Sequence, residues 1–272
     1  MCHFAPFLLT FRLIVLYYKY KIYRENRMEN KKLYRYETHL HTLPVSKCAK
    51  ASVRENLECY KALGYDGVFI TNHFIDGNIN GKLNHVGKGL GMTVDLEEYK
   101  ALINFYFSDY EESLALSDEI GIKVFVGVEI SYKGTDFLVY GLDKEWYLSH
   151  PEIVDMTKRE ELDFMRKEGA FIVHAHPFRE AYYIDHIRLF PRSVEAVEVL
   201  NACRTDEENR LADQYADNYS LLKVGGTDNH QAMARSRFSG VETEEPIECP
   251  EDYIRLVREG KIKIFSFLNE RE

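Results

Sequence analysis

Histidines and carboxylates recur in this 272-residue chain at the ends of short apolar runs. His39 and His41 are separated by one residue at the end of the run LYRYETHLH, so alternation along a strand places both rings on one face. Converging imidazole nitrogens are ligands for zinc, manganese or iron, and carboxylates complete such sites. A single His-x-His triplet occurs often by chance, so the interpretation depends on the other residues at the same place.

Other potential ligands follow other apolar runs of the chain. If these runs are parallel strands, their carboxyl ends converge at one edge, where residues far apart in sequence become neighbours. These potential ligands outnumber those that one ion needs. We therefore predict two or three divalent ions, with zinc, manganese or iron as candidates. The predicted ligands are His39, His41, His73, Glu129, His176, Asp228 and His230.

The elements that must position these residues alternate along the chain. Capping boxes at Ser52, Thr157 and Thr205 begin helices, and further helices are expected over 95–120 and 250–259. The apolar runs between them are nearly continuous, which indicates parallel strands covered on both faces. About seven strand–helix units predict a single-domain α/β fold of the TIM-like barrel type.

Composition and the first residues limit the possible partners. The chain has 35 Lys and Arg against 44 Asp and Glu, a net charge of −9, which argues against nucleic-acid binding. The apolar segment 4–18 is short for a membrane span and Arg12 interrupts it, so we expect no membrane partner. Five scattered cysteines without a Cys-x-x-Cys pair fit a reducing cytoplasm.

The chain start has a simple interpretation. No basic segment precedes the apolar run and no small-residue cleavage site follows it, so a signal peptide is not expected. Met28 opens a plausible start of its own. We therefore expect residues 1–27 to be a disordered extension or a mis-assigned start, and residues 28–272 to form the folded domain.

The segments ETHLHT, ITNHF, GVEIS, VHAHPFR and GGTDNH resemble, in order and spacing, the motifs of the PHP superfamily, named for polymerase and histidinol phosphatase. The resemblance covers about residues 36–230. It implies a distorted (β/α)7 barrel that binds a di- or trinuclear metal cluster, usually with phosphoesterase activity. By position it implies one ion held by His39, His41, Glu129 and Asp228, a second held by Glu129 and His176, and a third held by His73 and His230.

The chain departs from these motifs in two places. Asn72 stands before His73, where the family commonly has aspartate. The segment LPVSKCAKAS replaces the one that usually supplies another ligand of the third ion. Cys48 in this segment is either a thiolate ligand or a buried, unreactive cysteine. A ligand is also often expected from the strand AVEVLNA, where Glu198 and Asn201 remain open alternatives.

Two further residues are predicted to act on the substrate. His174 forms a second His-x-His triplet with His176 and is expected to point into the same site, where it either supports the ligands or faces the substrate and could protonate the leaving oxygen. Arg179 is the best candidate for phosphate, because a guanidinium matches phosphate oxygens. Other options are Arg204, Arg235, Arg237 and, in a glycine-rich loop over 73–93 that could cover the site, His85.

These residues predict a cytoplasmic metal-dependent phosphoesterase that hydrolyses a small phosphorylated metabolite, such as histidinol phosphate, a nucleotide or a sugar phosphate, through a metal-activated hydroxide. A metal-dependent amidohydrolase is the alternative, because such barrels also place His-x-His after the first strand. The carboxylated lysine common in those enzymes has no equivalent at the matching point of this sequence. A non-catalytic metal-binding barrel is the third interpretation, although a structural ion needs only four ligands.

Overall fold

The computed structural model describes residues 32–74 and 95–269. Contacts divide the chain into a unit at Met1–Leu33 and a larger unit at Tyr34–Glu272. The expected extension at 1–27, and His85 with most of its glycine-rich loop, lie outside the described residues. Within the described ranges, no helix is long and apolar enough to cross a membrane.

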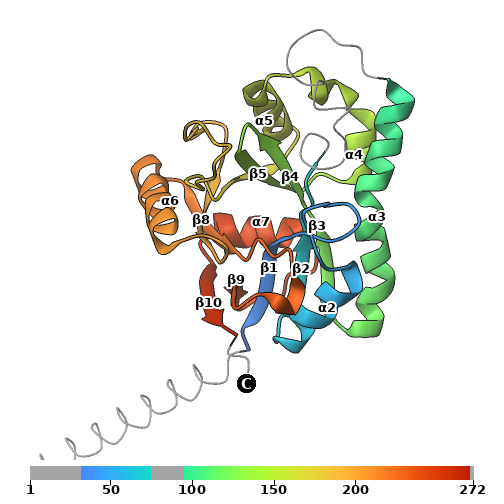
Figure 1. Ribbon diagram of the computed structural model, residues 1–272, viewed down its shortest axis with the longest axis vertical. Coiled ribbons are helices and arrows are strands. Elements are labelled where there is room, and N and C mark those ends of the chain that lie inside the picture. Colours follow the sequence, from blue (N-terminus) through green and yellow to red (C-terminus); the bar gives the residue numbers. More distant parts are fainter. Residues whose placement is uncertain (1–31, 75–94, 270–272) are drawn as a thin grey trace, which may run out of the picture. The chain divides into compact units, whose positions relative to one another are not determined.

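Strands and helices alternate through the first half of the larger unit and again through the second half (Figure 1). The first half contains β1 (Tyr34–Leu40), α2 (Val53–Ala62), β2 (Gly67–Ile70), α3 (Leu96–Ile120), β3 (Lys123–Val126), β4 (Val128–Tyr132), β5 (Thr135–Tyr140) and α4 (Lys144–Ser149). The second half contains η1 (Pro151–Asp155), α5 (Lys158–Lys167), β6 (Phe171–Ala175), β7 (Ala196–Asn201), α6 (Asp206–Tyr219), β8 (Leu222–Gly226), η2 (Ala232–Ala234), β9 (Arg237–Thr243), α7 (Pro250–Arg258) and β10 (Ile262–Leu268).

Three helices begin at the predicted capping boxes. Ser52, Thr157 and Thr205 each accept a hydrogen bond from the backbone N–H three residues later, and the glutamate at that position bonds back to the cap. These reciprocal bonds satisfy N–H groups that have no partner inside the helix. The helix predicted over 95–120 is confirmed as α3, which ends at Gly121 in the left-handed conformation.

The strands form two five-stranded sheets, ordered β10-β9-β1-β2-β3 and β4-β5-β6-β7-β8. The pairs β1–β2, β2–β3, β6–β7 and β7–β8 are parallel, as predicted. The prediction of a wholly parallel sheet is wrong, because β4–β5, β5–β6, β1–β9 and β9–β10 are antiparallel. Only Lys133 and Gly134, both with positive φ, separate β4 from β5, and so short a turn joins antiparallel strands alone.

The two sheets meet along two seams. At the first seam β3 continues into β4 through Gly127, where a Cβ would lie 2.9 Å from the Thr71 and Tyr140 side chains. At the second, the His41 N–H donates to the Asn229 carbonyl oxygen at 3.0 Å, next to the end of β1. The α/β class is confirmed, but the strands of the described residues pair as two sheets and do not form a closed barrel.

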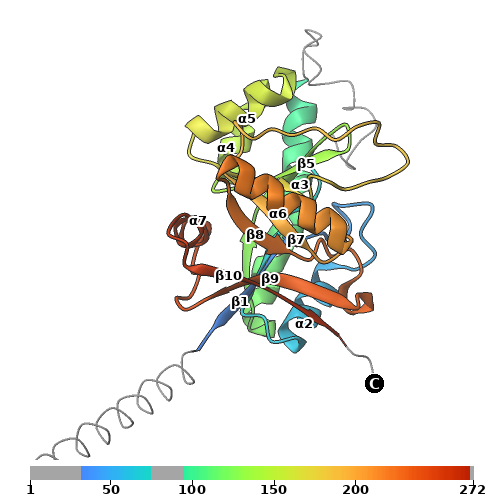
Figure 2. The same cartoon turned by 90° about the vertical axis from the view of Figure 1, so that its left-hand side faces the viewer.

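An aromatic core joins the two sheets to α7. Tyr36, Phe69 and Phe125 of the first sheet pack in one buried cluster with Tyr140 of the second sheet and Tyr253 of α7. The Tyr253 ring lies 4.9 Å from the Phe69 ring and 5.1 Å from the Tyr140 ring, measured between centroids. The helices α3, α4 and α5 pack against β4–β6, whereas α6 packs on β7 (Figure 2). The Tyr140 hydroxyl donates to the Thr38 carbonyl oxygen at 2.7 Å, so this core supports the end of β1.

Strand β9 approaches β1 closely at Gly240, where a Cβ would clash with the Tyr36 carbonyl oxygen. We expect Gly240→Ala to lower the free energy of unfolding by about 3 kcal/mol, measured by urea denaturation, because the backbone of β1 cannot yield. Gly64→Ala is the matched control, since nothing lies within 4 Å of its Cβ. It should cost about 1 kcal/mol, from the left-handed backbone alone. Equal losses in the two variants would contradict the close approach of β9 to β1.

Candidate metal centre

The seven predicted ligands meet at the edge where the two sheets join. His39 and His41 lie at the end of β1, and Asp228 lies in the turn after β8. The Asp228 N–H donates to the His39 carbonyl oxygen at 2.9 Å. His73 follows β2 and forms a parallel bridge with Glu129 of β4. The backbone thus confirms the prediction that these strand ends lie close together.

Glu129 occupies the middle of the cluster and is 1% exposed. Its Oε1 lies 3.2 Å from His39 Nε2 and 3.4 Å from His176 Nε2. Its Oε2 lies 2.8 Å from His73 Nδ1 and 3.3 Å from His41 Nε2. Neither oxygen accepts a hydrogen bond of good geometry from the described residues. Burying a carboxylate without hydrogen bonds destabilises the folded state unless positive charges face it.

His39, His41 and Glu129 each offer a ligand atom within 4.8 Å of the other two, and Asp228 lies beside the two histidines. The His39 and His41 Nε2 atoms lie 3.1 Å apart, and Asp228 Oδ1 lies 3.6 Å and 3.4 Å from them. His39 Nε2 lies 3.2 Å from Glu129 Oε1 and His41 Nε2 lies 3.3 Å from Glu129 Oε2, so these five pairs of atoms are 3.1–3.6 Å apart. Ligands bound about 2.0–2.1 Å from a tetrahedral ion lie roughly 3.3–3.4 Å apart. These pairs have the spacing of ligands that share one ion, although Glu129 reaches the two histidines with different oxygens.

A second position lies around His176. Its Nε2 is buried without a hydrogen-bond partner and lies 3.4 Å from Glu129 Oε1, 3.8 Å from Asp228 Oδ2 and 3.9 Å from Asp136 Oδ2. Asp136 was not predicted from the sequence. It lies at the start of β5, and the antiparallel direction of β5 brings that amino end to the carboxyl end of β6. The predicted Arg179 also reaches this position, 2.7 Å from Asp136 Oδ2.

A third group contains His41, Cys48, His73 and His230, whose ligand atoms all lie within 4.8 Å of one another. Of the two interpretations of Cys48, a buried inert thiol does not agree with the structure, because Cys48 is half-buried and lies among these imidazoles. Burial raises the pKa of this thiol, but hydrogen bonds with His230 and His73 outweigh burial and lower the pKa to about 6.

The carboxylates and histidines shift one another's protonation. Burial favours neutral His39, but Glu198, Asp228 and Glu129 outweigh burial and hold the pKa of His39 well above its usual range. Burial also raises the pKa of Glu129, yet His73 and His39 outweigh it and hold that pKa well below its usual range. Without ions, the cluster is thus an array of buried carboxylates neutralised by protons on imidazole.

Glu198 orients two of the ligands. Its Oε1 lies 3.0 Å from His39 Nδ1, and its Oε2 accepts hydrogen bonds from the His176 N–H at 3.1 Å and from Asn201 Nδ2 at 2.9 Å. Glu198 and Asn201, the two alternatives left open in the strand AVEVLNA, therefore both lie at the site. A carboxylate on Nδ1 directs Nε2 of the same ring toward a metal.

Asn72 joins the site to helix α3. Its Oδ1 accepts from the Thr42 N–H at 2.8 Å, and its Nδ2 donates to Asp109 Oδ2 at 3.1 Å. The Thr42 hydroxyl donates to the same carboxylate at 2.6 Å. Asp109 thus supplies a carboxylate beside the position where the PHP motif commonly has aspartate. The sequence carried one signal for this role: Asp109 is a charged residue on the buried face of α3, three positions after Tyr106.

His174 does not point into the metal cluster, contrary to the sequence prediction. Its ring is buried and stacks on Phe137, with centroids 5.0 Å apart, and its Nδ1 faces the Tyr215 hydroxyl at 3.4 Å. Strand β6 ends at Ala175, and His176 has a φ of 26°, so the alternation that would align the two histidines is broken. Burial lowers the pKa of His174 to about 3.

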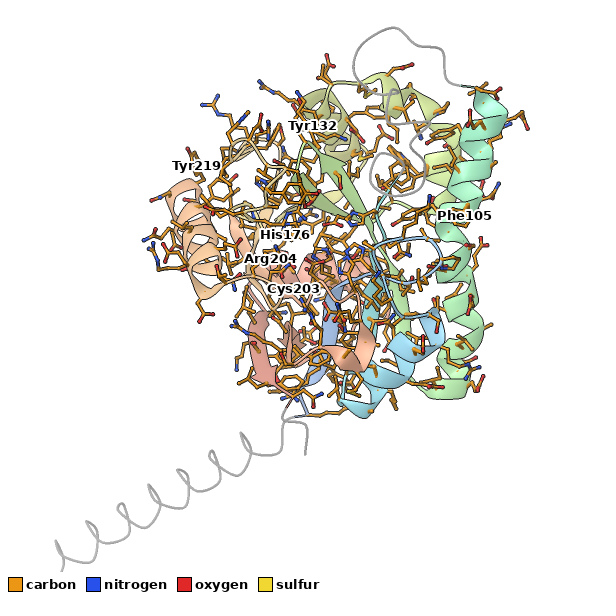
Figure 3. The ribbon with its side chains drawn as sticks, viewed as in Figure 1. Phe105, Tyr132, His176, Cys203, Arg204 and Tyr219 are labelled. Atoms are coloured by element: carbon orange, nitrogen blue, oxygen red, sulfur yellow. The ribbon has the colours of Figure 1, made fainter. Side chains whose placement is uncertain are left out.

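The other arginine options divide into two groups. Arg204 Nη2 lies 3.9 Å from Asp228 Oδ2, and Arg235 donates to Cys203 Sγ, which in turn contacts the Asp228 carbonyl oxygen. Arg204 and His176, both labelled in Figure 3, each lie within 4 Å of Asp228 Oδ2. Arg237 points elsewhere, because it pairs with Asp206 at 2.9 Å. Arg204 and Arg235 are therefore near the centre and Arg237 is not.

Comparisons with known proteins agree with this geometry at the level of fold. No family model matches the chain. An uncharacterized protein of Methanocaldococcus jannaschii is 30% identical over 145 residues, which cover 48% of this chain and 59% of that relative. The match therefore spans less than two thirds of the relative.

Two solved structures share the architecture. One is a two-domain protein from Bacteroides vulgatus that contains a predicted PHP-like metal-dependent phosphoesterase; it has a TM-score of 0.59 and 14% identity, covering 86% of this chain and 65% of that chain. The chain has a PHP-like fold. PsfC from Pseudomonas syringae also matches, with a TM-score of 0.53 and 16% identity over 88% of this chain and 92% of PsfC. The PHP-like fold thus agrees with the motifs on which the resemblance depends.

Removing the Glu198 carboxylate should weaken metal binding by releasing the His39 ring. We expect Glu198→Gln to lower the affinity for zinc by 10–100-fold, measured by competition with a chromophoric chelator. Glu195→Gln is the matched control, because Glu195 pairs with Arg258 on the surface. An unchanged affinity in Glu198→Gln would contradict the orienting contact.

Metal binding by this centre should also depend on pH. The raised pKa values of His39 and His73 mean that an ion must displace protons from these rings. Affinity should therefore rise with pH, roughly tenfold per pH unit for each proton displaced. Isothermal titration in buffers of different ionisation enthalpy counts those protons. Binding without proton release would show that the rings are neutral before the ion arrives.

Proposed function

We propose that the chain is a metal-dependent phosphoesterase that hydrolyses a small phosphorylated metabolite. The observation that carries this proposal is Glu129, a buried carboxylate whose two oxygens face four imidazole nitrogens and accept no hydrogen bond from the described residues. A carboxylate with both oxygens directed at separate ligand groups is suited to bridge two ions. We infer two or three divalent ions, with zinc, manganese or iron as candidates.

Ions at such a centre supply hydroxide near neutral pH and neutralise charge that builds on phosphoryl oxygens. The chain's own residues then bind and orient the ester. Arg179 is held by Asp136 and by the Gly134 carbonyl oxygen at 3.1 Å, with its side chain 15% exposed. A guanidinium fixed in this way can face a phosphate without losing much conformational entropy. Arg204, next to Asp228, is a second donor on the same edge.

The proposal also covers the finer points of fold, substrate and location. Backbone bonds at the two seams support a distorted (β/α)7 barrel that is interrupted between the sheets. A net charge of −9 favours a small substrate over a nucleic acid. Cys48, Cys59, Cys203 and Cys249 form no disulfide within the described residues, which supports a cytoplasmic location.

The test is hydrolysis of p-nitrophenyl phosphate by the full chain, before and after chelation and return of zinc or manganese. We expect His39→Ala and Asp228→Asn each to reduce kcat by at least about 100-fold, because each loses one proposed metal ligand. His186→Ala is the control, since His186 is an exposed loop residue that pairs with Asp185. Inductively coupled plasma mass spectrometry on each variant counts the bound ions.

Three outcomes are informative. Hydrolysis that is lost on chelation and restored by metal supports the phosphoesterase. Full activity in both His39→Ala and Asp228→Asn overturns it. Two or three bound ions without hydrolysis of any phosphate ester would favour the amidohydrolase alternative, which amide substrates then test.

A further inference from the structure

The group around Cys48 differs in chemistry from the rest of the centre. The other positions offer only imidazole nitrogens and carboxylate oxygens, whereas this one brings a thiol together with histidines. Cys48 lies in the segment between β1 and α2, and the Lys50 N–H donates to the His230 carbonyl oxygen, which joins that segment to the turn after β8. The segment is thus held beside His230 by the backbone.

His41 does not belong to this group when it shares an ion with His39, Glu129 and Asp228. Its Nδ1 lies 3.1 Å from Ser46 Oγ, so only Nε2 faces the centre. That atom lies 3.1–3.4 Å from atoms of His39, Glu129 and Asp228, the spacing of ligands that share one ion. A single nitrogen lone pair serves one ion. The Cys48 group therefore retains three protein ligands.

His230 is oriented to bind through Nε2. Its Nδ1 lies 2.9 Å from the Asp228 carbonyl oxygen, and since a carbonyl only accepts, Nδ1 carries the proton. The lone pair then lies on Nε2, the nitrogen that is free to bind an ion. Backbone hydrogen bonding of Nδ1 is the usual support for a histidine that binds metal through Nε2.

We propose that Cys48, His73 and His230 hold one ion through a thiolate and two imidazoles, leave one coordination place open, and select zinc over manganese. Thiolate is a soft ligand that favours zinc, whereas manganese favours oxygen ligands. Three protein ligands with an open fourth place are the arrangement of zinc sites that bind water or substrate, in contrast to closed structural sites. The inference rests on the proposed metal binding but not on the phosphoesterase reaction.

Cobalt(II) is the probe, because it replaces zinc in tetrahedral sites and a cobalt–thiolate bond gives a near-ultraviolet charge-transfer band. The full chain, stripped of metal by chelation, is titrated with cobalt(II) in a non-coordinating reductant. We expect the band in the wild type and in Cys249→Ser, whose thiol lies at the start of α7. We expect its loss in Cys48→Ser, with the visible bands of the other positions retained.

Cys48→His provides the second variant. It restores a nitrogen ligand, so the number of bound ions should equal that of the wild type while the charge-transfer band stays absent. Circular dichroism on both variants checks folding. Persistence of the band in Cys48→Ser, or its absence from a fully cobalt-loaded wild type, overturns the thiolate assignment.

Two additions test the remaining parts of the proposal. Inorganic phosphate should shift the charge-transfer band if a coordination place is open, and an unshifted band at saturating phosphate would show that His41 closes the set. Excess manganese should leave the band unchanged, because it does not displace a thiolate-bound ion, and loss of the band would overturn the selectivity. The readout is independent of hydrolysis: a band without phosphatase activity overturns only the proposed function, and activity without a band overturns only this inference.

Discussion

The burial of Glu129 among four imidazole rings is the constraint on which the rest of the site depends. Its two oxygens lie 2.8–3.4 Å from those nitrogens and receive no hydrogen bond from the described residues. A carboxylate removed from water in this way must be compensated by positive charge. Protons on His39 and His73 supply that charge without metal, and divalent ions replace those protons when they bind.

Hydrogen bonds from neighbouring residues hold the histidines and the segments that carry them in place. Glu198 holds His39 and the backbone of His176, while Asn72 and Asp109 tie the segment after β1 to helix α3. Glu37, fully buried, accepts hydrogen bonds from the His39 and Thr227 N–H groups, so it joins β1 to the segment after β8. These contacts hold the histidines and carboxylates close together in the absence of any ion.

The centre contains both hard and soft potential ligand atoms, in different groups. Nitrogen and oxygen surround Glu129, and among the described residues Cys48 is the one sulfur ligand in these groups. Two kinds of coordination within one cluster allow ions of different identity to occupy neighbouring positions, since ligand type as well as affinity decides which metal binds.

The sequence by itself indicated the helix caps, the alternation of strands and helices, and the seven histidines and carboxylates that lie together, because capping and strand-end position are local patterns in the chain. Tertiary structure alone decided the placement of Asp136, Asp109 and His174. Asp136 reaches the site because β5 runs antiparallel, and Asp109 because α3 packs over the segment after β1. His174 leaves the site because the backbone turns at His176. Strand direction, helix packing and the left-handed conformation of His176 depend on contacts between distant segments. A local sequence pattern therefore does not predict them.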